Sequence, residues 1–384
     1  MNFTFRTPST IIFGAGSRNE HLETLMSLGD TPFIVTGSLK PGVSDFSEEF
    51  AQRLPGTVFF RVSGEPSIPL VNRALHKARE NGCDCVIALG GGSVIDTGKA
   101  VAALLTNGDD CLEFLEVVGK GKPLARAPLP LAALPTTAGT GSEVTKNAVI
   151  SCPEHNVKVS MRSPLMIPRY AIVDPELTLT MPPEVTAATG LDALTQLIEA
   201  YITRNRNPAT DGFCREGISM AAVSLKKAYE DGSDLEARTD MSCAGLFGGI
   251  ALANAGLGAV HGFAGPIGGM FNIPHGLICA VLLPHVYSAN LRSGMTCGED
   301  SDLGNRFKEL AVLLTGRPDA SKEDGALAIA SLCEQLGVPR LSDFGIRRKD
   351  FPDIQRKAAC SSSMKGNPVD FSERELHDIL EEAF

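Results

Sequence analysis

The feature that most constrains the fold is an alternation of short apolar runs with segments of helical period. The apolar runs, each a candidate strand, are residues 10–13, 32–36, 57–62, 84–89, 129–134 and 171–173. Helical periodicity follows two of them, over residues 68–81 and 94–105. A strand that is apolar along its whole length is buried on both faces, as in a parallel sheet with helices packed on either side. This part of the chain is therefore predicted to form an α/β fold.

The pattern changes near residue 181. Pro182-Pro183-Glu184 is expected to open a helix with proline in its first turn, and helical period with small residues continues from there. At 384 residues the chain is also too long for one ordinary core. We therefore predict two domains: an α/β domain over residues 1–180 and an all-helical domain over residues 181–384.

Net charge and cysteine content limit which binding partners and which cellular compartment are expected. The formal net charge of −10 argues against nucleic-acid binding as the main role. The first residues do not resemble a signal peptide, and no apolar run is long enough to span a membrane. The ten cysteines are scattered without a CxxC pair, which favours reduced thiols. A cytoplasmic protein that binds neither nucleic acid nor membranes is expected.

Two small-residue loops follow predicted strands of the sheet. The run over 84–89 leads into Gly91, Gly92 and Ser93 and then into a helix, where backbone N–H groups and the helix dipole can bind a phosphate. The run over 129–134 leads into Thr136, Thr137 and the rest of a hydroxyl-rich loop. A tight turn that merely needs glycines is the alternative for the first loop. Because ligands bind at strand carboxyl ends in such sheets, the two loops together favour a phosphate-bearing cofactor.

A third strand end bears on the cofactor's identity. In dinucleotide folds a carboxylate at a strand end commonly holds the ribose hydroxyls. Here the strand over 32–36 is followed by Gly37, Ser38 and Lys40, with no acid at that point. The absence of an acidic side chain leaves room for the 2′-phosphate of NADP, which Ser38 or Lys40 would bind. Alternatively, the segment is only a turn and NAD is held by other contacts.

The segment over residues 259–276 carries two histidines, His261 and His275, separated by a glycine-rich stretch. Glycine provides little to bury, but it allows the backbone to approach closely, so that two imidazoles can converge on one point. A divalent metal is the natural candidate for that point. The alternative is a pair of structural histidines in a helix-packing segment.

A predicted helix over residues 189–201 supplies a carboxylate. Asp192 and Gln196 are four residues apart and share one face, in apolar surroundings where an ionised aspartate needs a partner. A helix-capping role for Asp192 is the alternative. Two imidazoles and one carboxylate, from His261, His275 and Asp192, form a ligand set suited to Fe(II) or Zn(II) with an open position.

These motifs together resemble those of the iron-containing (group III) alcohol dehydrogenases. The shared stretches, in order, are GGGSVIDTGKA, PTTAGTGSEVT, SPLMIPRYAIVDPELT, TGLDALTQLIEAY and AVHGFAGPIGGMFNIPHG. The resemblance covers nearly the whole chain. It implies a dinucleotide-binding N-terminal domain, a helical C-terminal domain and an architecture like that of dehydroquinate synthase. It also implies NAD or NADP as cofactor and a homodimer or larger homo-oligomer.

The resemblance also assigns roles to residues. It implies that the pyrophosphate lies on Gly91, Gly92 and Ser93, and that further contacts to the cofactor come from Thr136, Thr137, Thr140 and Lys158. The family's metal ligands are one aspartate and three histidines. Asp192, His261 and His275 match three of these positions, and Gln196 stands where the fourth is a histidine.

Three positions depart from the family pattern. Gln196 is a neutral donor in place of an imidazole, from which weaker metal retention is expected. Gly265 stands where many members carry a histidine near the nicotinamide, and Gly37 stands where NAD-preferring members carry aspartate. The first two departures bring the chain closer to maleylacetate reductases, some of which work without a metal.

The function predicted from these residues is reversible hydride transfer between NAD(P)H and a small alcohol or aldehyde. Asp192, His261 and His275 act in catalysis through the metal, which polarises the carbonyl. A metal-independent, maleylacetate-type reductase is the alternative within the same class. Two alternatives lie outside it: a dehydroquinate synthase-like lyase and a non-catalytic binding protein.

Overall fold

The structure is a computed structural model that describes residues 2–155, 157–295 and 301–384. The chain divides into two compact units, which are described separately below. One unit comprises Arg6–Met181. The other comprises Pro182–Phe384 together with Met1–Phe5, and Phe5 of that short segment stacks on Phe213.

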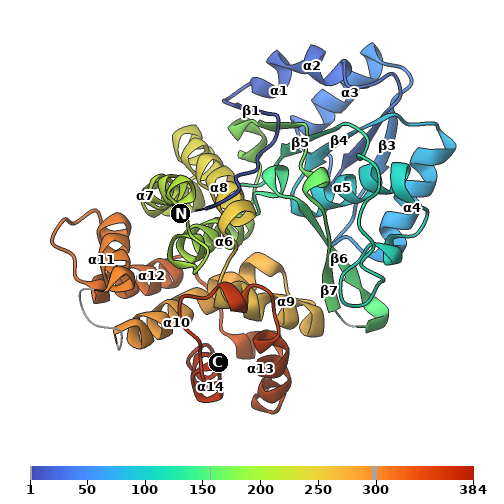
Figure 1. Cartoon of the computed structure of the whole chain (residues 1–384). Helices are drawn as coiled ribbons and strands as arrows, with labels where there is room; N and C mark the ends of the chain where they lie inside the picture. The colour runs from blue at the N-terminus through green and yellow to red at the C-terminus, as the bar shows by residue number, and fades with distance from the viewer. Residues whose placement is uncertain (1, 156, 296–300) are drawn as a thin grey trace. The chain divides into compact units, whose positions relative to one another are not determined.

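The unit formed by Arg6–Met181 is built on a six-stranded sheet in which every pairing is parallel, with the strand order β1-β8-β5-β4-β2-β3 (Figure 1). The strands are β1 (Thr10–Phe13), β2 (Pro32–Thr36), β3 (Val58–Arg61), β4 (Cys85–Gly90), β5 (Leu131–Pro135) and β8 (Tyr170–Val173). All six strands expected from the sequence are therefore present, with ends that differ from the expected ones by two residues or fewer. The predicted parallel α/β fold is confirmed.

Helices cover both faces of this sheet, as the continuously apolar strands require. Side chains that alternate along β2, β4 and β5 point to opposite faces because the strand period is two. On one face they pack against α4 (Ile68–Glu80) and α5 (Gly92–Asn107). On the other face they pack against α2 (Leu22–Met26) and α3 (Val43–Arg53).

Part of this unit was not predicted. No strand was predicted between residues 135 and 170, but the structure has an antiparallel hairpin there, formed by β6 (Asn147–Cys152) and β7 (Val157–Arg162). The helices α1 (Ser17–Glu20), α2 and α3 were not predicted either. The hairpin strands are only partly buried and mix polar with apolar residues, so they lack the apolar runs that identified the sheet.

The second unit is helical in its described residues (Figure 1). Its first helix, α6, opens with proline in the first turn as expected. The helices are α6 (Pro183–Ile202), α7 (Pro208–Glu230), α8 (Leu235–Ala255), α9 (Ala259–Phe271), α10 (His275–Met295), α11 (Asp302–Thr315), α12 (Lys322–Gln335), α13 (Phe351–Ala359) and α14 (Glu373–Glu382). A core of buried apolar residues joins α9 and α10 to α13 and α14.

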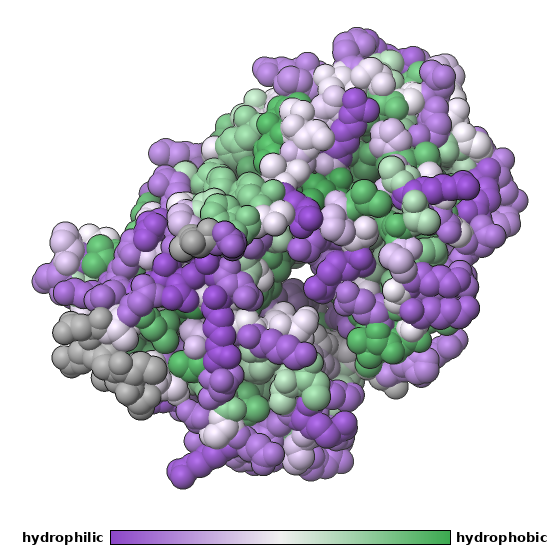
Figure 2. All heavy atoms as spheres, viewed as in Figure 1, coloured by the Kyte–Doolittle hydropathy of each residue, from purple (hydrophilic) through white to green (hydrophobic). Residues whose placement is uncertain are grey.

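The length and hydropathy of a helix decide whether it could span a membrane. Within the described residues, no single helix has the length and apolarity to cross a membrane, and α8 and α9 reach that threshold only as a pair bent by 99°. Figure 2 shows hydrophilic residues spread over both units on the face that it draws, with apolar residues between them.

Candidate functional site

The carboxylate of Asp192 lies in the middle of α6. Because α6 begins at Pro183, Asp192 is well inside the helix, and the alternative that it caps a helix start is wrong. The residue is only 1% exposed. A buried carboxylate needs a compensating partner, and here the partners are imidazoles from two other helices.

His261 is held at both ring nitrogens by carboxylates of α6. Its Nε2 lies 3.3 Å from Oδ1 of Asp192, and its Nδ1 lies 2.7 Å from Oε2 of Glu199. The other oxygen of Glu199 accepts a hydrogen bond from the backbone N–H of Val260 at 2.6 Å. Glu199 was not predicted from the sequence, although its spacing of seven residues from Asp192 places both on one helix face.

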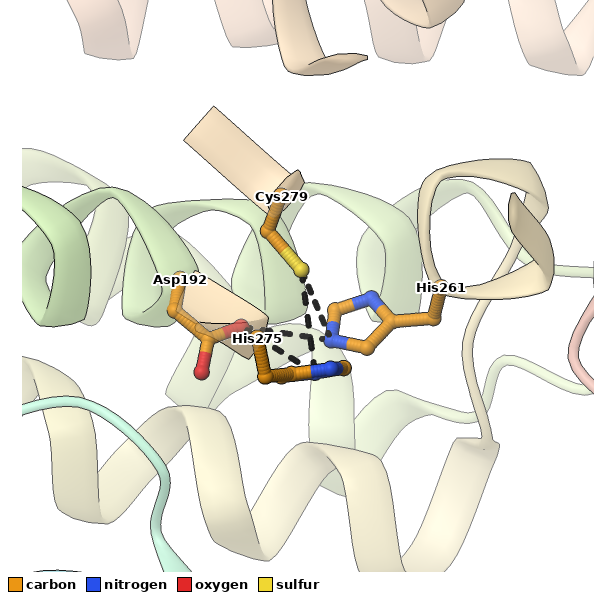
Figure 3. A group of neighbouring side chains, drawn as sticks. All are labelled: Asp192, His261, His275 and Cys279. Atoms are coloured by element: carbon orange, nitrogen blue, oxygen red, sulfur yellow. Dashed lines mark hydrogen bonds and ion pairs between the residues drawn. The ribbon is translucent and has the colours of Figure 1, made fainter. Parts of the chain in front are cut away.

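His275 and Cys279 complete a cluster of four donor atoms with Asp192 and His261 (Figure 3). They stand one turn apart at the start of α10, so both project toward α6 and α9. The Sγ of Cys279 lies 3.8 Å from Nε2 of His261 and 3.7 Å from Nε2 of His275. Cys279 was not predicted from the sequence, although its spacing of four residues from His275 places both on one helix face.

A glycine allows α10 to approach α6 at this point. A Cβ added to Gly276 would lie 2.6 Å from the carbonyl oxygen of Ala188 and 3.5 Å from Cβ of Asp192. The first of these distances is too short for any side chain. Glycine after His275 therefore brings the imidazole within reach of Asp192, which explains why a glycine stands at this position.

Burial and neighbouring charges shift the pKa values of Asp192 and His261 in opposite directions. Burial raises the pKa of Asp192, but the hydrogen bond from His261 and the charge of His275 outweigh it and hold the pKa below its usual value. Burial lowers the pKa of His261, but Cys279, Asp192 and Glu199 together raise it well above its usual value. Burial raises the pKa of the Cys279 thiol to about 12. Without a metal, these shifts favour an ion pair between the carboxylate of Asp192 and the protonated ring of His261.

The residues present fit a divalent metal. The four donor atoms all lie within 4.8 Å of one another, and they combine carboxylate, imidazole and thiol, the groups that bind zinc and iron in proteins. Asp192, His261 and Cys279 are nearly or fully inaccessible, whereas the side chain of His275 is 43% exposed. The cluster is therefore open on the side of His275.

Two other positions from the sequence analysis lie in the helical unit. Gln196 is buried on α6, and its Oε1 would be 3.1 Å from a Cβ added to Gly248 of α8. Its expected role as a metal ligand stays a prediction. Gly265 lies within α9, directly before Pro266, and a Cβ added there would meet no described atom within 4 Å.

In the α/β unit, the two predicted phosphate loops lie against each other. Gly91 caps α5 after β4, and the neighbouring strand β5 leads into the second loop. A Cβ added to Gly91 would be 3.2 Å from Cγ2 of Thr137, and one added to Gly92 would be 2.9 Å from Cγ2 of Thr140. The glycines thus allow close packing of the loops at the carboxyl ends of adjacent strands. Thr136 joins the two strand ends through its N–H, which donates to the carbonyl of Gly90 at 3.1 Å.

A buried lysine fixes the second loop to α5. The Nζ of Lys99 donates to the hydroxyls of Ser142 and Thr145, at 3.0 and 2.8 Å. Burial lowers the pKa of Lys99 to about 8. Glu143 is buried beside it, and burial raises the pKa of this carboxyl to about 7. The loop is thus held by a charged network that was not anticipated from the sequence.

The remaining predicted cofactor residues are spread over this unit. Gly37 and Ser38 follow β2, which is paired with β4, so they lie beside the first loop's strand. A Cβ added to Gly37 would be 3.4 Å from Cγ2 of Val94. The ammonium of Lys40 donates to the carbonyl of Thr180 at 2.6 Å. Lys158 lies on β7 and forms an ion pair with Glu65 at 2.6 Å.

Two family models match the chain and account for most of its length. The model described as "Iron-containing alcohol dehydrogenase" matches residues 8–175. The model described as "Fe-containing alcohol dehydrogenase family, C-terminal" matches residues 186–384. The first match covers the α/β unit, and the second covers the helices that carry Asp192, His261 and His275.

Similar proteins extend over the full chain. "Alcohol dehydrogenase 4" of Saccharomyces cerevisiae is 35% identical over 388 residues, covering 99% of this chain and 98% of that protein. The solved structure of an alcohol dehydrogenase from Oenococcus oeni is 33% identical, with a TM-score of 0.91 and full coverage of both chains. That of sulfoacetaldehyde reductase from Bifidobacterium kashiwanohense, in complex with NAD+, is 27% identical, with a TM-score of 0.88 and coverage of 100% and 99%. The chain therefore belongs to the iron-containing alcohol dehydrogenase family and is an oxidoreductase that acts on CH–OH groups.

Proposed function

We propose that this chain transfers hydride reversibly between NAD(H) and a small alcohol or aldehyde, using a divalent metal held by Asp192, His261 and His275. The observation that carries the proposal is the convergence of these three side chains, from three different helices, on one buried point. The sequence pattern alone indicated candidate ligands. Their donor atoms lie close enough together to share one cation.

The chain's own residues would prepare this point for a cation. A bound divalent metal supplies Lewis-acid polarisation of the substrate's oxygen. Asp192 contributes a buried negative charge. Glu199 accepts a hydrogen bond from Nδ1 of His261, which leaves the lone pair of Nε2 free to coordinate the metal. The apolar surroundings of α9 and α10 limit water around the buried side of the cluster.

For the cofactor we propose that the pyrophosphate binds at Gly91, Gly92 and Ser93, where α5 begins. The two-loop packing at adjacent strand ends supports this role, since backbone N–H groups at a helix N-terminus bind phosphate. The further contacts proposed for the cofactor are from Thr136, Thr137, Thr140 and Lys158. The NAD+ bound to sulfoacetaldehyde reductase supports NAD as the dinucleotide.

NADP is a further proposal, because Gly37 places no carboxylate at the end of β2 to repel a 2′-phosphate. Ser38 is the residue proposed to contact that phosphate. Lys40 is a weaker candidate than the sequence suggested, since its ammonium already donates to Thr180. The ratio of activities with NADH and NADPH tests this point.

Three finer features also stay proposals. Gly265 leaves space within α9, which would suit a bulkier or differently charged substrate than histidine at this position would admit. Reduced thiols support a cytoplasmic location, and the nine described cysteines are all free. Homodimeric or larger assembly follows from the family resemblance alone.

The reaction is tested by following NADH and NADPH oxidation with a panel of small aldehydes and carboxylated ketones. Each assay is run with metal-stripped protein and with protein given Fe(II) or Zn(II). We expect turnover of an aldehyde that requires metal and is lost in His261→Ala. Equal rates without metal would instead support the metal-independent reductase of a carboxylated substrate. No reduction in any sample would contradict the proposed reaction.

A further inference from the structure

We infer that Cys279 is itself a metal ligand, and that its thiolate makes this an Asp–His–His–Cys centre that prefers Zn(II) to Fe(II). The inference rests on the proposed metal site and adds a donor that the family's aspartate and three histidines do not include. It also assigns to Cys279 the place that the sequence analysis gave to Gln196.

Four distances between donor atoms of the cluster can be compared with the edges of a tetrahedron around one cation: three agree to about 0.2 Å, and the Asp192–His275 distance is about 0.6 Å longer. Zinc lies about 2.0–2.1 Å from nitrogen or oxygen and about 2.3 Å from sulfur, so tetrahedral ligands stand about 3.6 Å apart for sulfur–nitrogen pairs and about 3.3 Å for oxygen–nitrogen pairs. The Sγ of Cys279 lies 3.7 and 3.8 Å from the two Nε2 atoms. The Oδ1 of Asp192 lies 3.3 and 3.9 Å from the same atoms.

The position of Cys279 argues against a purely space-filling role. A buried cysteine usually packs as a small apolar residue. Cys279 does border the apolar core of α9 and α10, but its sulfur points toward both imidazoles and Asp192, as Figure 3 shows. The orientation follows from the spacing, because residues one turn apart on α10 project the same way.

Charge also favours this donor set. Asp192 and a Cys279 thiolate together carry two negative charges, which balance a divalent cation when both imidazoles are neutral. Balanced charge matters here because Asp192 and Cys279 have almost no contact with solvent. A coordinated thiol gives up its proton to the cation's field. With glutamine in that place the ligands carry one negative charge, and the second buried negative charge is that of Glu199, which contacts His261 instead of the cation.

Ligand chemistry then determines the choice of metal. Thiolate is a soft donor that favours zinc, whereas sets of imidazole and carboxylate alone also suit iron(II). A site in which sulfur replaces an imidazole is therefore expected to hold zinc more tightly relative to iron(II). Cys279 is thus a specificity-determining residue for the metal.

The test uses Co(II), whose visible bands report a bound ion and whose near-ultraviolet charge-transfer band reports a thiolate ligand. Metal-stripped full-length protein is titrated with Co(II) as wild type, Cys279→Ser, Gln196→Leu and Cys214→Ala. Cys214 is a buried cysteine of α7, outside the cluster, and serves as the matched control. Far-ultraviolet circular dichroism checks that each variant is folded.

We expect the charge-transfer band in wild type, Gln196→Leu and Cys214→Ala, and its loss in Cys279→Ser while the visible bands persist. Visible bands without a charge-transfer band in wild type would overturn this inference and leave the proposed metal site standing. No cobalt spectrum in folded wild type would overturn both.

A second readout addresses metal preference without using activity. Zn(II) and Fe(II) affinities are measured by chelator competition under anaerobic conditions for wild type and Cys279→Ser. The ratio of zinc to iron affinity is expected to fall in the variant, because the soft donor that favours zinc is lost. An unchanged ratio would overturn the assignment of metal preference to Cys279.

Discussion

The Oε2 of Glu199 lies 2.7 Å from Nδ1 of His261, and both residues are almost completely buried. With the Nδ1 proton donated to this carboxylate, the Nε2 of His261 is directed toward Asp192 and Cys279. The second oxygen of Glu199 holds the N–H of Val260, so one side chain fixes both the ring and the first turn of α9. Glu199 is therefore a positioning residue for the proposed metal ligand.

Replacing Glu199 with glutamine is expected to weaken metal binding by about tenfold to a hundredfold, as for other residues that orient a ligating histidine. The amide keeps the shape but loses the negative charge that favours an Nδ1 proton. Metal affinity by chelator competition measures the effect, and excess metal should restore part of the activity.

Glu230→Gln, at the exposed end of α7, provides the matched control and should leave the affinity unchanged. If Glu199→Gln binds metal as tightly as wild type, the orienting role assigned to Glu199 is wrong.

Replacing Gly276 with alanine is expected to lower the free energy of unfolding by about 1–3 kcal/mol, the usual cost of overpacking. The added methyl group would overlap the carbonyl of Ala188 on α6, and α10 would have to move away with His275. Metal affinity should fall as well. Urea denaturation and metal titration measure the two effects.

Gly212→Ala on α7 is the control, because a Cβ there meets no described atom within 4 Å. Alanine is the better helix former, so this variant should be more stable than wild type by up to about 1 kcal/mol. Equal stability of the Gly276→Ala variant and wild type would show that α10 does not need a glycine to approach α6.

The sequence was sufficient to predict features that depend on local pattern. Apolar runs identified every strand of the parallel sheet, and the glycines after β4 marked a helix start that the structure has. Asp192, His261 and His275 were candidates because of their residue types and their motifs. The structure adds that their donor atoms share one point.

Features that depend on contacts through space were missed. Cys279 joins the cluster, and Glu199 contacts His261, because α6, α9 and α10 pack together. Helical spacing from His275 and from Asp192 places each residue on the right face of its own helix, but it does not show that the three helices meet. The β6–β7 hairpin was missed because its strands mix polar and apolar residues. The cap role weighed for Asp192 failed because the helix begins at Pro183, earlier than the segment in which it was considered.

Glu143 predicts a pH dependence of stability. Burial raises its pKa to about 7 in the folded chain, above the ordinary value of 4.5, so the folded state favours the protonated form. Its stabilising contribution is complete below pH 4.5 and is lost as the pH rises through about 7. Glutamine mimics the protonated form. Relative to Glu143→Gln, wild type should therefore lose about 1–3 kcal/mol of unfolding free energy between about pH 4.5 and pH 7.

Urea denaturation of both proteins at about pH 4.5 and about pH 8 measures this difference. Glu154→Gln, at an exposed position beside the β6–β7 hairpin, controls for general charge effects and should show no such change. A difference between wild type and Glu143→Gln that is the same at both pH values would contradict the effect assigned to burial of this carboxyl.

Gly37→Asp tests the choice of dinucleotide. A carboxylate at the end of β2 would repel a 2′-phosphate and accept hydrogen bonds from ribose hydroxyls. The space permits a side chain, since the added Cβ would be 3.4 Å from Val94. The ratio of kcat/KM for NADPH to that for NADH is expected to fall by about tenfold or more, equivalent to about 1.4 kcal/mol. A ratio that does not change would place the adenosine ribose elsewhere.

Catalysis is proposed to depend on one metal held by Asp192, His261 and His275. The most direct measurement titrates metal-stripped protein with Fe(II) or Zn(II) and records bound metal and the rate of aldehyde-dependent NADH oxidation in the same samples. We expect the rate to rise from near zero in proportion to bound metal and to level off at a single metal per chain. In Asp192→Ala, both bound metal and rate should stay near zero. A full rate in the stripped protein, or a full rate in Asp192→Ala without bound metal, would contradict this dependence.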